Sequence, residues 1–137
     1  MDKRLLALSA VFFVAFLLFV SAVVFDKPLT QLTRAKEETL PSGENSLLFA
    51  WPLTAKADGS TPIKVNVFVR SRTKRLISGK TVTLTTTLGN ISPASSISDK
   101  NGETAFTVTS TSPGTAEITG TIDNSTPLQK TLTVKFE

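Results

Sequence analysis

The chain has few of the side chains that catalysis usually requires. Its 137 residues include no histidine and no cysteine. Imidazole acid–base chemistry, thiolate nucleophiles, disulfides and zinc sites of the usual Cys/His type are therefore excluded. A hydrolase would have to use paired carboxylates or a serine with a lysine, but the acidic residues are scattered over predicted turns and strand faces: Asp58, Asp99, Glu103, Glu117 and Asp123. We expect neither an enzyme nor a cofactor.

Asp99–Glu103 (DKNGE) has the spacing that begins a calcium loop. A complete twelve-residue loop also needs a closing carboxylate. Here Phe106 and Val108 occupy predicted strand positions instead. The sequence therefore predicts a tight turn through Asn101-Gly102, and no metal site.

Four cations within six residues form the densest charge cluster of the chain: Arg70, Arg72, Lys74 and Arg75. Such a cluster could contact an anionic surface, such as lipid head groups, wall polymer or the acidic patch of a partner. The alternative is a solvated loop whose charges keep a sheet edge soluble. Nucleic acid is not expected as a partner, because no aromatic side chains interleave with the cations for base stacking.

Two aromatic residues lie in predicted strands. Phe68 falls on the polar face of its strand, so it is a candidate for contact with a partner, although a single exposed aromatic residue is also commonplace. Trp51 is expected to pack at the edge of the fold with its indole N–H near the surface.

From Ser46 onward, apolar and polar residues alternate in short runs, as they do in strands with one buried face. Turn signals such as Asp58-Gly59, Asn101-Gly102 and Pro113-Gly114 separate the runs. The pattern predicts an all-β, antiparallel sandwich of about seven strands over residues 47–137. The predicted strands are 47–53, 63–69, 81–88, 95–98, 104–110, 115–122 and 130–136.

Near the N-terminus, 21 consecutive residues from Leu5 to Phe25 carry no charge. As a helix this run is about 31 Å long, close to the roughly 30 Å hydrocarbon core of a bilayer. We therefore predict one transmembrane α-helix at residues 5–25, a signal anchor in contact with lipid. Its large anchoring side chains are Leu5, Phe12, Phe16, Phe19 and Phe25.

A cleaved signal peptide is the main alternative, because residues 20–22 form an acceptable cleavage tripeptide; a buried helix of a soluble protein is a third reading. Lys3 and Arg4 precede the run, and Lys27, Arg34 and Lys36 follow it, so positive charge alone does not decide orientation. The signal-like start and the type of domain that follows favour a single pass through the cell membrane with the N-terminus inside and the C-terminus outside. Residues 1–4 would then be a cytoplasmic tip and the C-terminal domain would be extracytoplasmic.

Residues 26–46 are predicted to form a linker. Apolar residues are too sparse there for an amphipathic helix, although an Arg34–Glu38 pair would suit a short exposed one. Pro41-Ser42-Gly43 then ends any regular structure. We expect a solvated tether.

Several coordinated motifs resemble the bacterial Ig-like domain of the invasin/intimin type, group 1. They are AKADGSTPIKVNVFV (55–69), ISGKTVTLTTTLGNIS (77–92), SDKNGETAFTVTS (98–110) and PGTAEITGTI (113–122). One motif departs from the family: its usual Asp-x-x-Gly-x-Pro turn is replaced by Ser71–Leu76. Any function that the family places at that end of the sandwich is therefore not carried over to this chain.

The resemblance implies a rigid spacer or interaction module without chemistry. We expect a membrane-anchored domain with a protein or cell-surface partner, acting in adhesion or in the structure of the envelope. The alternative function is that of a subunit of a pilus-like filament packed through its N-terminal helix, although the chain lacks the Gly and the early Glu of prepilins. An accessory subunit bound to other membrane helices, or a homo-oligomer, stays open.

Overall fold

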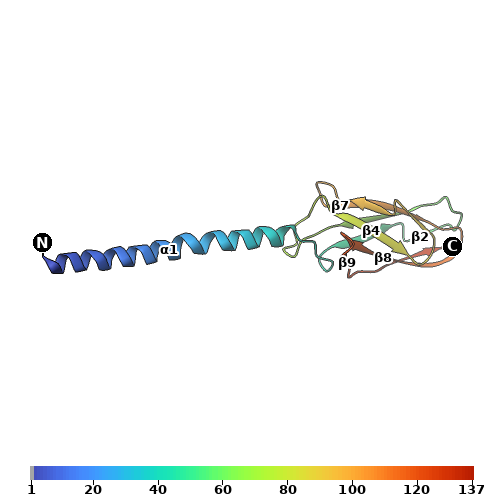
Figure 1. The fold of residues 1–137 in the computed structure, drawn as a ribbon. Coiled ribbons are helices and arrows are strands. Elements are labelled where there is room, and N and C mark those ends of the chain that lie inside the picture. Colours follow the sequence, from blue (N-terminus) through green and yellow to red (C-terminus); the bar gives the residue numbers. More distant parts are fainter. Residues whose placement is uncertain (1) are drawn as a thin grey trace. The chain divides into compact units, whose positions relative to one another are not determined.

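The computed structural model describes residues 2–24 and 38–137 with their side chains (Figure 1). Contacts divide the chain into two compact units, Met1–Lys36 and Glu37–Glu137. The first unit contains an apolar helix and the second a β-sandwich, as the sequence predicts.

Helix α1 spans Lys3–Thr39. Its segment Lys3–Val24 has a mean hydropathy of 2.7, and none of its apolar window is buried. Within the described residues it is the one helix that is long and apolar enough to cross a membrane, judged by length and composition. Exposure of an entire apolar helix in water is unfavourable, which makes a partner surface or a bilayer its expected environment.

The predicted anchoring side chains project freely from α1. The exposed fraction is 75% for Leu5, 67% for Phe12, 52% for Phe16 and 66% for Phe19. Phe12 and Phe16 stack along one helix face, with ring centroids 6.3 Å apart. Phe25, the fifth predicted anchor, lies outside the residues whose side chains are described.

The helix extends farther than the sequence predicts, because it includes part of the expected linker at residues 26–46. No amphipathic helix is expected in residues 26–46, because their apolar residues are too sparse to form that pattern. Residues 31–38 (QLTRAKEE) are nevertheless mostly strong helix formers, and such residues favour a helix without an apolar stripe. Arg34 lies outside the described residues, so its pairing with Glu38 stays a prediction.

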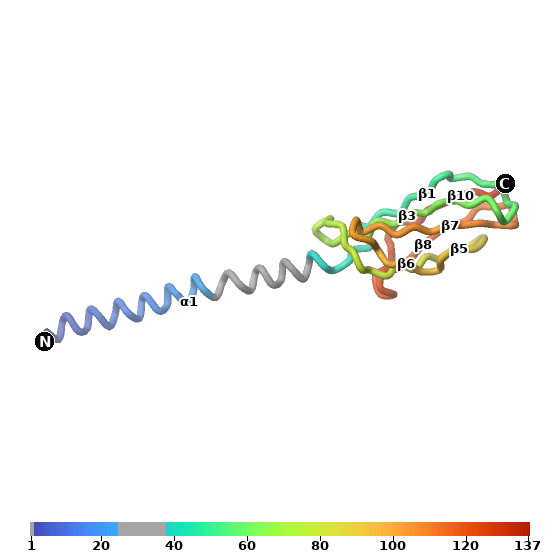
Figure 2. Tube along the Cα trace, turned by 90° about the horizontal axis from the view of Figure 1, so that it is seen from above, coloured from blue at the N-terminus to red at the C-terminus, as the bar shows by residue number. Residues whose placement is uncertain are grey.

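The sandwich contains ten strands in two sheets. The first sheet has the order β1-β3-β7-β5, with β1 at Leu47–Trp51, β3 at Ile63–Phe68, β7 at Glu103–Thr109 and β5 at Asn90–Ser92. The second has the order β2-β10-β8-β4-β6, with β2 at Thr54–Ala55, β10 at Leu132–Phe136, β8 at Gly114–Ile122, β4 at Thr81–Thr86 and β6 at Ser95–Ile97; β9 at Thr126–Pro127 pairs with β8. All pairs are antiparallel except β2 with β10. Figure 2 shows β1, β3 and β7 side by side.

The fold class is confirmed, but there are three more strands than the sequence predicts. The additional strands are β2, β5 and β9, which have two, three and two residues. A strand this short has no room for a period-two pattern, so only its neighbours in the sheet define it.

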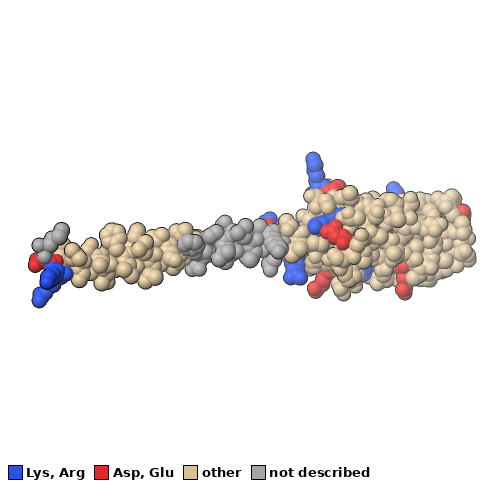
Figure 3. Space-filling model, viewed as in Figure 1, with Lys and Arg blue, Asp and Glu red and all other residues tan. Residues whose placement is uncertain are grey.

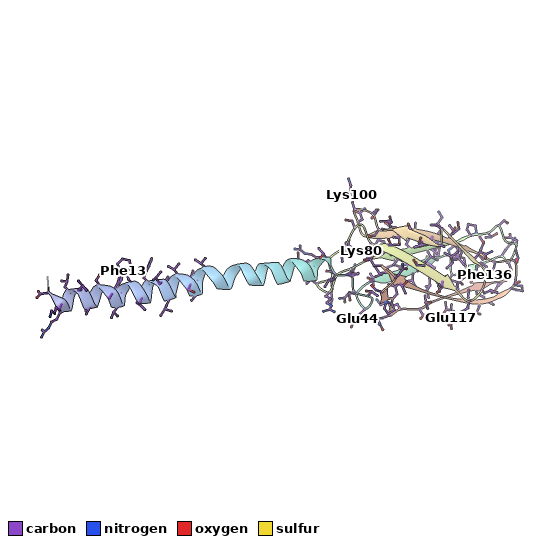
Figure 4. All side chains as sticks on the ribbon, in the orientation of Figure 1. Phe13, Glu44, Lys80, Lys100, Glu117 and Phe136 are labelled. Carbon is purple, nitrogen blue, oxygen red and sulfur yellow. The ribbon has the colours of Figure 1, made fainter. Side chains whose placement is uncertain are left out.

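The core lies between the sheets and contains the apolar residues that alternation places inward. In β3, Ile63, Val65 and Val67 are fully buried, and Phe106 of β7 is 2% exposed. Phe136 of β10 packs in the same cluster, inside the sandwich in Figure 4. Leu88 and Leu132 pack against this cluster but are only partly buried.

Residues 41–46, which the sequence assigns to a free tether, are bound to the sandwich. Pro41 forms an isolated β-bridge with Ser71, and the Ser42 N–H donates to the Arg70 carbonyl at 2.8 Å. The Asn45 amide donates to the carbonyls of Ser71 and Arg72, at 3.2 Å each. The polar residues of this segment therefore satisfy backbone groups of the domain, which a composition-based linker assignment cannot foresee.

Candidate interaction surfaces

The basic cluster occupies a tight loop after β3. Arg70 and Leu76 form an antiparallel bridge that closes it, and the Ser71 N–H donates to the Arg75 carbonyl at 2.8 Å. Lys74 has a φ of 64°, in the left-handed region. The loop is therefore a folded hairpin end with a defined backbone.

Its four cations are not equivalent. Arg70 is half-buried, and its Nε is buried without a hydrogen-bond partner among the described residues. Arg75 is exposed but pairs with Glu38 at 3.1 Å. Arg72 and Lys74 are exposed and make no ion pair with a described residue.

Acidic side chains also lie at this end of the sandwich. Figure 3 shows blue and red groups together where the chain enters the domain, and Figure 4 places Lys80, Lys100 and Glu44 there. Lys80 pairs with Asp123 at 2.9 Å. Burial acts to raise the pKa of Asp123, but the Lys80 ammonium and the Thr81 N–H outweigh it and lower that pKa. The end is mixed in charge, so contact with an anionic surface stays a prediction that falls on Arg72 and Lys74.

Asp99–Glu103 forms the predicted tight turn. Asp99 Oδ1 accepts hydrogen bonds from the N–H groups of Asn101 at 2.8 Å and Glu103 at 2.9 Å. Gly102 has a φ of 69°, and a Cβ there would lie 2.9 Å from the Val69 carbonyl oxygen. The carboxylate thus organises its own loop. Across the residues that the structure describes, no three acidic side chains gather as a metal site would require.

Aromatic residues gather on the outer face of β1 and β3. In the antiparallel register Leu47 lies opposite Phe68, Phe49 opposite Asn66 and Trp51 opposite Lys64. The rings of Phe49 and Phe68 meet edge to face, with centroids 6.0 Å apart and an interplanar angle of 73°. Phe68 therefore lies outward as predicted, but it is half-buried because Phe49 covers it.

Trp51 is more exposed than the sequence predicts. Its exposed fraction is 79%, and that of Phe49 is 52%. A hollow of about 290 Å³ lies among these residues, lined by Phe49, Ala50, Trp51, Lys64, Asn66 and Phe68. The Asn66 amide donates to Glu103 on the neighbouring strand, and Lys64 makes no ion pair with a described residue. The sequence predicted a contact role for Phe68 alone and placed Trp51 only at the edge of the fold, because the run LLFAW is apolar throughout and its period does not distinguish the two faces.

Comparison with known proteins agrees with this architecture. The model of the family described as bacterial Ig-like domain (group 1) matches residues 45–137. No curated protein matches the chain.

Three solved structures of adhesins are similar. A C-terminal fragment of intimin, in complex with the intimin-binding domain of the translocated intimin receptor, is 31% identical, with a TM-score of 0.55 over 66% of this chain and 30% of that one. Invasin, a bacterial integrin-binding protein, is 29% identical, with a TM-score of 0.63 over 72% of this chain and 20% of that one. The Yersinia pseudotuberculosis adhesin InvE is 26% identical, with a TM-score of 0.63 over 74% of this chain and 28% of that one. The chain spans less than a third of the length of each of these structures. Because the family model covers the whole sandwich, the chain belongs to the group 1 family of bacterial Ig-like domains.

Proposed function

We propose that this protein is a single-pass, membrane-anchored interaction module that presents one Ig-like domain outside the cytoplasm. Its role is non-catalytic: adhesion to a protein or cell-surface partner, or a structural contact within the cell envelope. The observation that carries the proposal is the combination of a group 1 Ig-like domain with a fully exposed apolar segment, Lys3–Val24, on the same chain.

The similar structures support a protein partner. Intimin was solved with a receptor domain, and invasin is an integrin-binding protein. Ig-like sandwiches present sheet faces, edges and end loops for such contacts and need no reactive group. In this chain the aromatic outer face of β1 and β3 is the apolar part of that surface, and Phe68 remains the contact residue proposed from the sequence.

Cysteine labelling in intact spheroplasts tests the proposed topology, because the natural chain has no cysteine. We expect a Lys100→Cys variant to react with a membrane-impermeant maleimide before lysis, since Lys100 is exposed in the turn between β6 and β7. The matched control, Asp2→Cys, should react only after lysis. The reverse order of labelling would place the domain in the cytoplasm and refute the proposal.

Purification in mild detergent tests the interaction role. A partner that is retained by the full chain and lost when residues 45–137 are deleted would support it. A partner retained by the helix alone would favour an accessory subunit held within the membrane.

A further inference from the structure

Strand β1 is an unprotected edge of the first sheet. It pairs with β3 alone among the described strands, and no other backbone hydrogen bond involves residues 47–51. Alternate N–H and C=O groups on its outer side therefore have no hydrogen-bond partner among the residues that the structure describes. An edge of this kind is a template for one more strand.

The remaining edges differ from β1. Strands β2, β5 and β6 have only two or three residues each. Strand β1 has five residues, LLFAW, with no charge and no proline. Proteins usually blunt an exposed edge with charge, proline or shortness. The shortness that limits pairing at the other edges therefore does not apply to β1.

The hollow beside β1 adds a place for side chains. A strand added at the edge would extend the row of outward side chains that includes Phe49 and Trp51. Lys64, opposite Trp51, contributes a positive charge that no described acidic residue neutralises. An apolar surface with one uncompensated cation is complementary to a segment that carries apolar residues and a carboxylate.

We propose that β1 binds an extended segment of a partner protein as an additional strand, with its apolar residues against Phe49 and Trp51 and an Asp or Glu that reaches past Trp51 toward Lys64 on β3. The inference rests on the proposed function, because it names the partner chemistry of that interaction module. Backbone pairing with β1 provides the affinity, and the hollow with Lys64 provides the selectivity.

The chain carries its own reporter for this contact. Trp51 is the only tryptophan of the chain, and the chain contains no tyrosine. A bound strand covers Trp51, which shifts its fluorescence to shorter wavelength and protects it from iodide quenching.

The test uses the full chain in phosphatidylcholine nanodiscs. A library of random ten-residue peptides is selected in parallel on the natural protein and on the Lys64→Glu variant. We expect peptides selected on the natural protein to alternate apolar residues and to share an acidic one, and those selected on Lys64→Glu to share a basic one. A synthetic copy of a selected acidic peptide should shift Trp51 fluorescence and lose at least about tenfold in affinity for Lys64→Glu.

Two controls separate strand addition from other contacts. Lys130→Glu reverses the charge of an exposed lysine outside the hollow and should leave the affinity unchanged. The second control uses two versions of the selected peptide, each N-methylated at every second amide, in the two possible alternations. One version should lose binding and the other should keep it, because only one set of the peptide's N–H groups faces β1.

Other outcomes overturn the inference. Strand addition at this site would be excluded if the selected peptides show no charge preference. It would also be excluded if both N-methylated peptides bind equally well. A shift of Trp51 fluorescence with rising protein concentration alone would identify a second copy as the occupant, and a shift on adding phosphatidylglycerol vesicles would identify a membrane surface. None of these outcomes alters the labelling result that tests the topology.

Discussion

Asp58 illustrates how single side chains build the turns of this domain. Its Oδ1 accepts hydrogen bonds from the Ser60 N–H at 2.8 Å and the Thr61 N–H at 2.7 Å, while Oδ2 accepts from the Thr61 hydroxyl. These donors, with the Thr61 N–H foremost, hold the pKa of Asp58 well below its usual range. Gly59 follows with a φ of 74°. The Asp-Gly pair is therefore a structural motif of the fold.

Replacement of Asp58 by Asn should destabilise the domain in a pH-dependent way. Because the pKa is lower in the folded state, the carboxylate contributes its full stability above about pH 4 and loses it as the pH falls through the folded-state value. The difference in unfolding free energy between the natural protein and Asp58→Asn should be largest at pH 7 and shrink in acid. Urea unfolding followed by circular dichroism measures it.

Glu117→Gln is the matched control for that experiment, since this exposed carboxyl on β8 accepts no hydrogen bond from a described residue. A difference for Asp58→Asn that is constant between pH 7 and pH 2.5 would contradict the assigned role of the charge, because these pH values lie about 3 units above and about 1.4 units below an ordinary aspartate pKa.

Two glycines should respond differently to alanine. A Cβ at Gly43 would lie 1.9 Å from the Pro127 carbonyl oxygen, so Gly43→Ala must displace backbone and should cost about 2–3 kcal/mol or more. Gly79 has a φ of 73° but open space around it, so Gly79→Ala should cost only about 1–2 kcal/mol of backbone strain. Urea unfolding measures both variants. If Gly43→Ala and Gly79→Ala lose similar amounts of unfolding free energy, residues 41–46 are less firmly bound to the sandwich than the structure indicates.

At the scale of the strand, the two faces perform different tasks. The inward faces of β3 and β7 are buried and, apart from Thr104, apolar. The outward face of β1 is also apolar, yet it covers no core. Folding therefore accounts for the buried aromatic residues such as Phe106, whereas Phe49 and Trp51 remain exposed.

Alanine substitutions should separate the two sets. Phe106→Ala removes a ring that is 2% exposed and should cost about 3–5 kcal/mol of stability. Phe49→Ala removes a ring that is 52% exposed and contacts Phe68, and should cost about 1 kcal/mol or less. Thermal unfolding compares them, and a large loss for Phe49→Ala would mean that this face serves the fold rather than a partner.

At the scale of the whole molecule, the proposed membrane location depends on the apolar segment Lys3–Val24, which is long and apolar enough to cross a bilayer. The full chain should remain in the membrane pellet after carbonate extraction, and a chain lacking residues 2–24 should appear in the soluble fraction. Mass spectrometry of the native N-terminus provides the control. A terminus late in the apolar run, near residues 20–22, would indicate a cleaved signal peptide. A new terminus created by cleavage within the first ten residues would favour the filament alternative.

The sequence by itself determined the elements that depend on local pattern. Twenty-one uncharged residues predict an apolar helix, and period-two alternation places residues such as Val65 and Phe106 in the core. The turn at Asp99 was also predictable, because Asp and Asn-Gly act through hydrogen bonds only two to four residues away. In each case the interaction that specifies the structure is close in sequence.

Only the tertiary structure decided the features that join distant segments. The short strands β2, β5 and β9 exist through their neighbours, and Glu38 reaches Arg75 across 37 positions of the sequence. The aromatic face arises because the register sets Phe49 of β1 beside Phe68 of β3, which a uniformly apolar run such as LLFAW does not reveal. Which face of such a strand is buried depends on where the opposing sheet lies, and that is settled by packing rather than by local sequence.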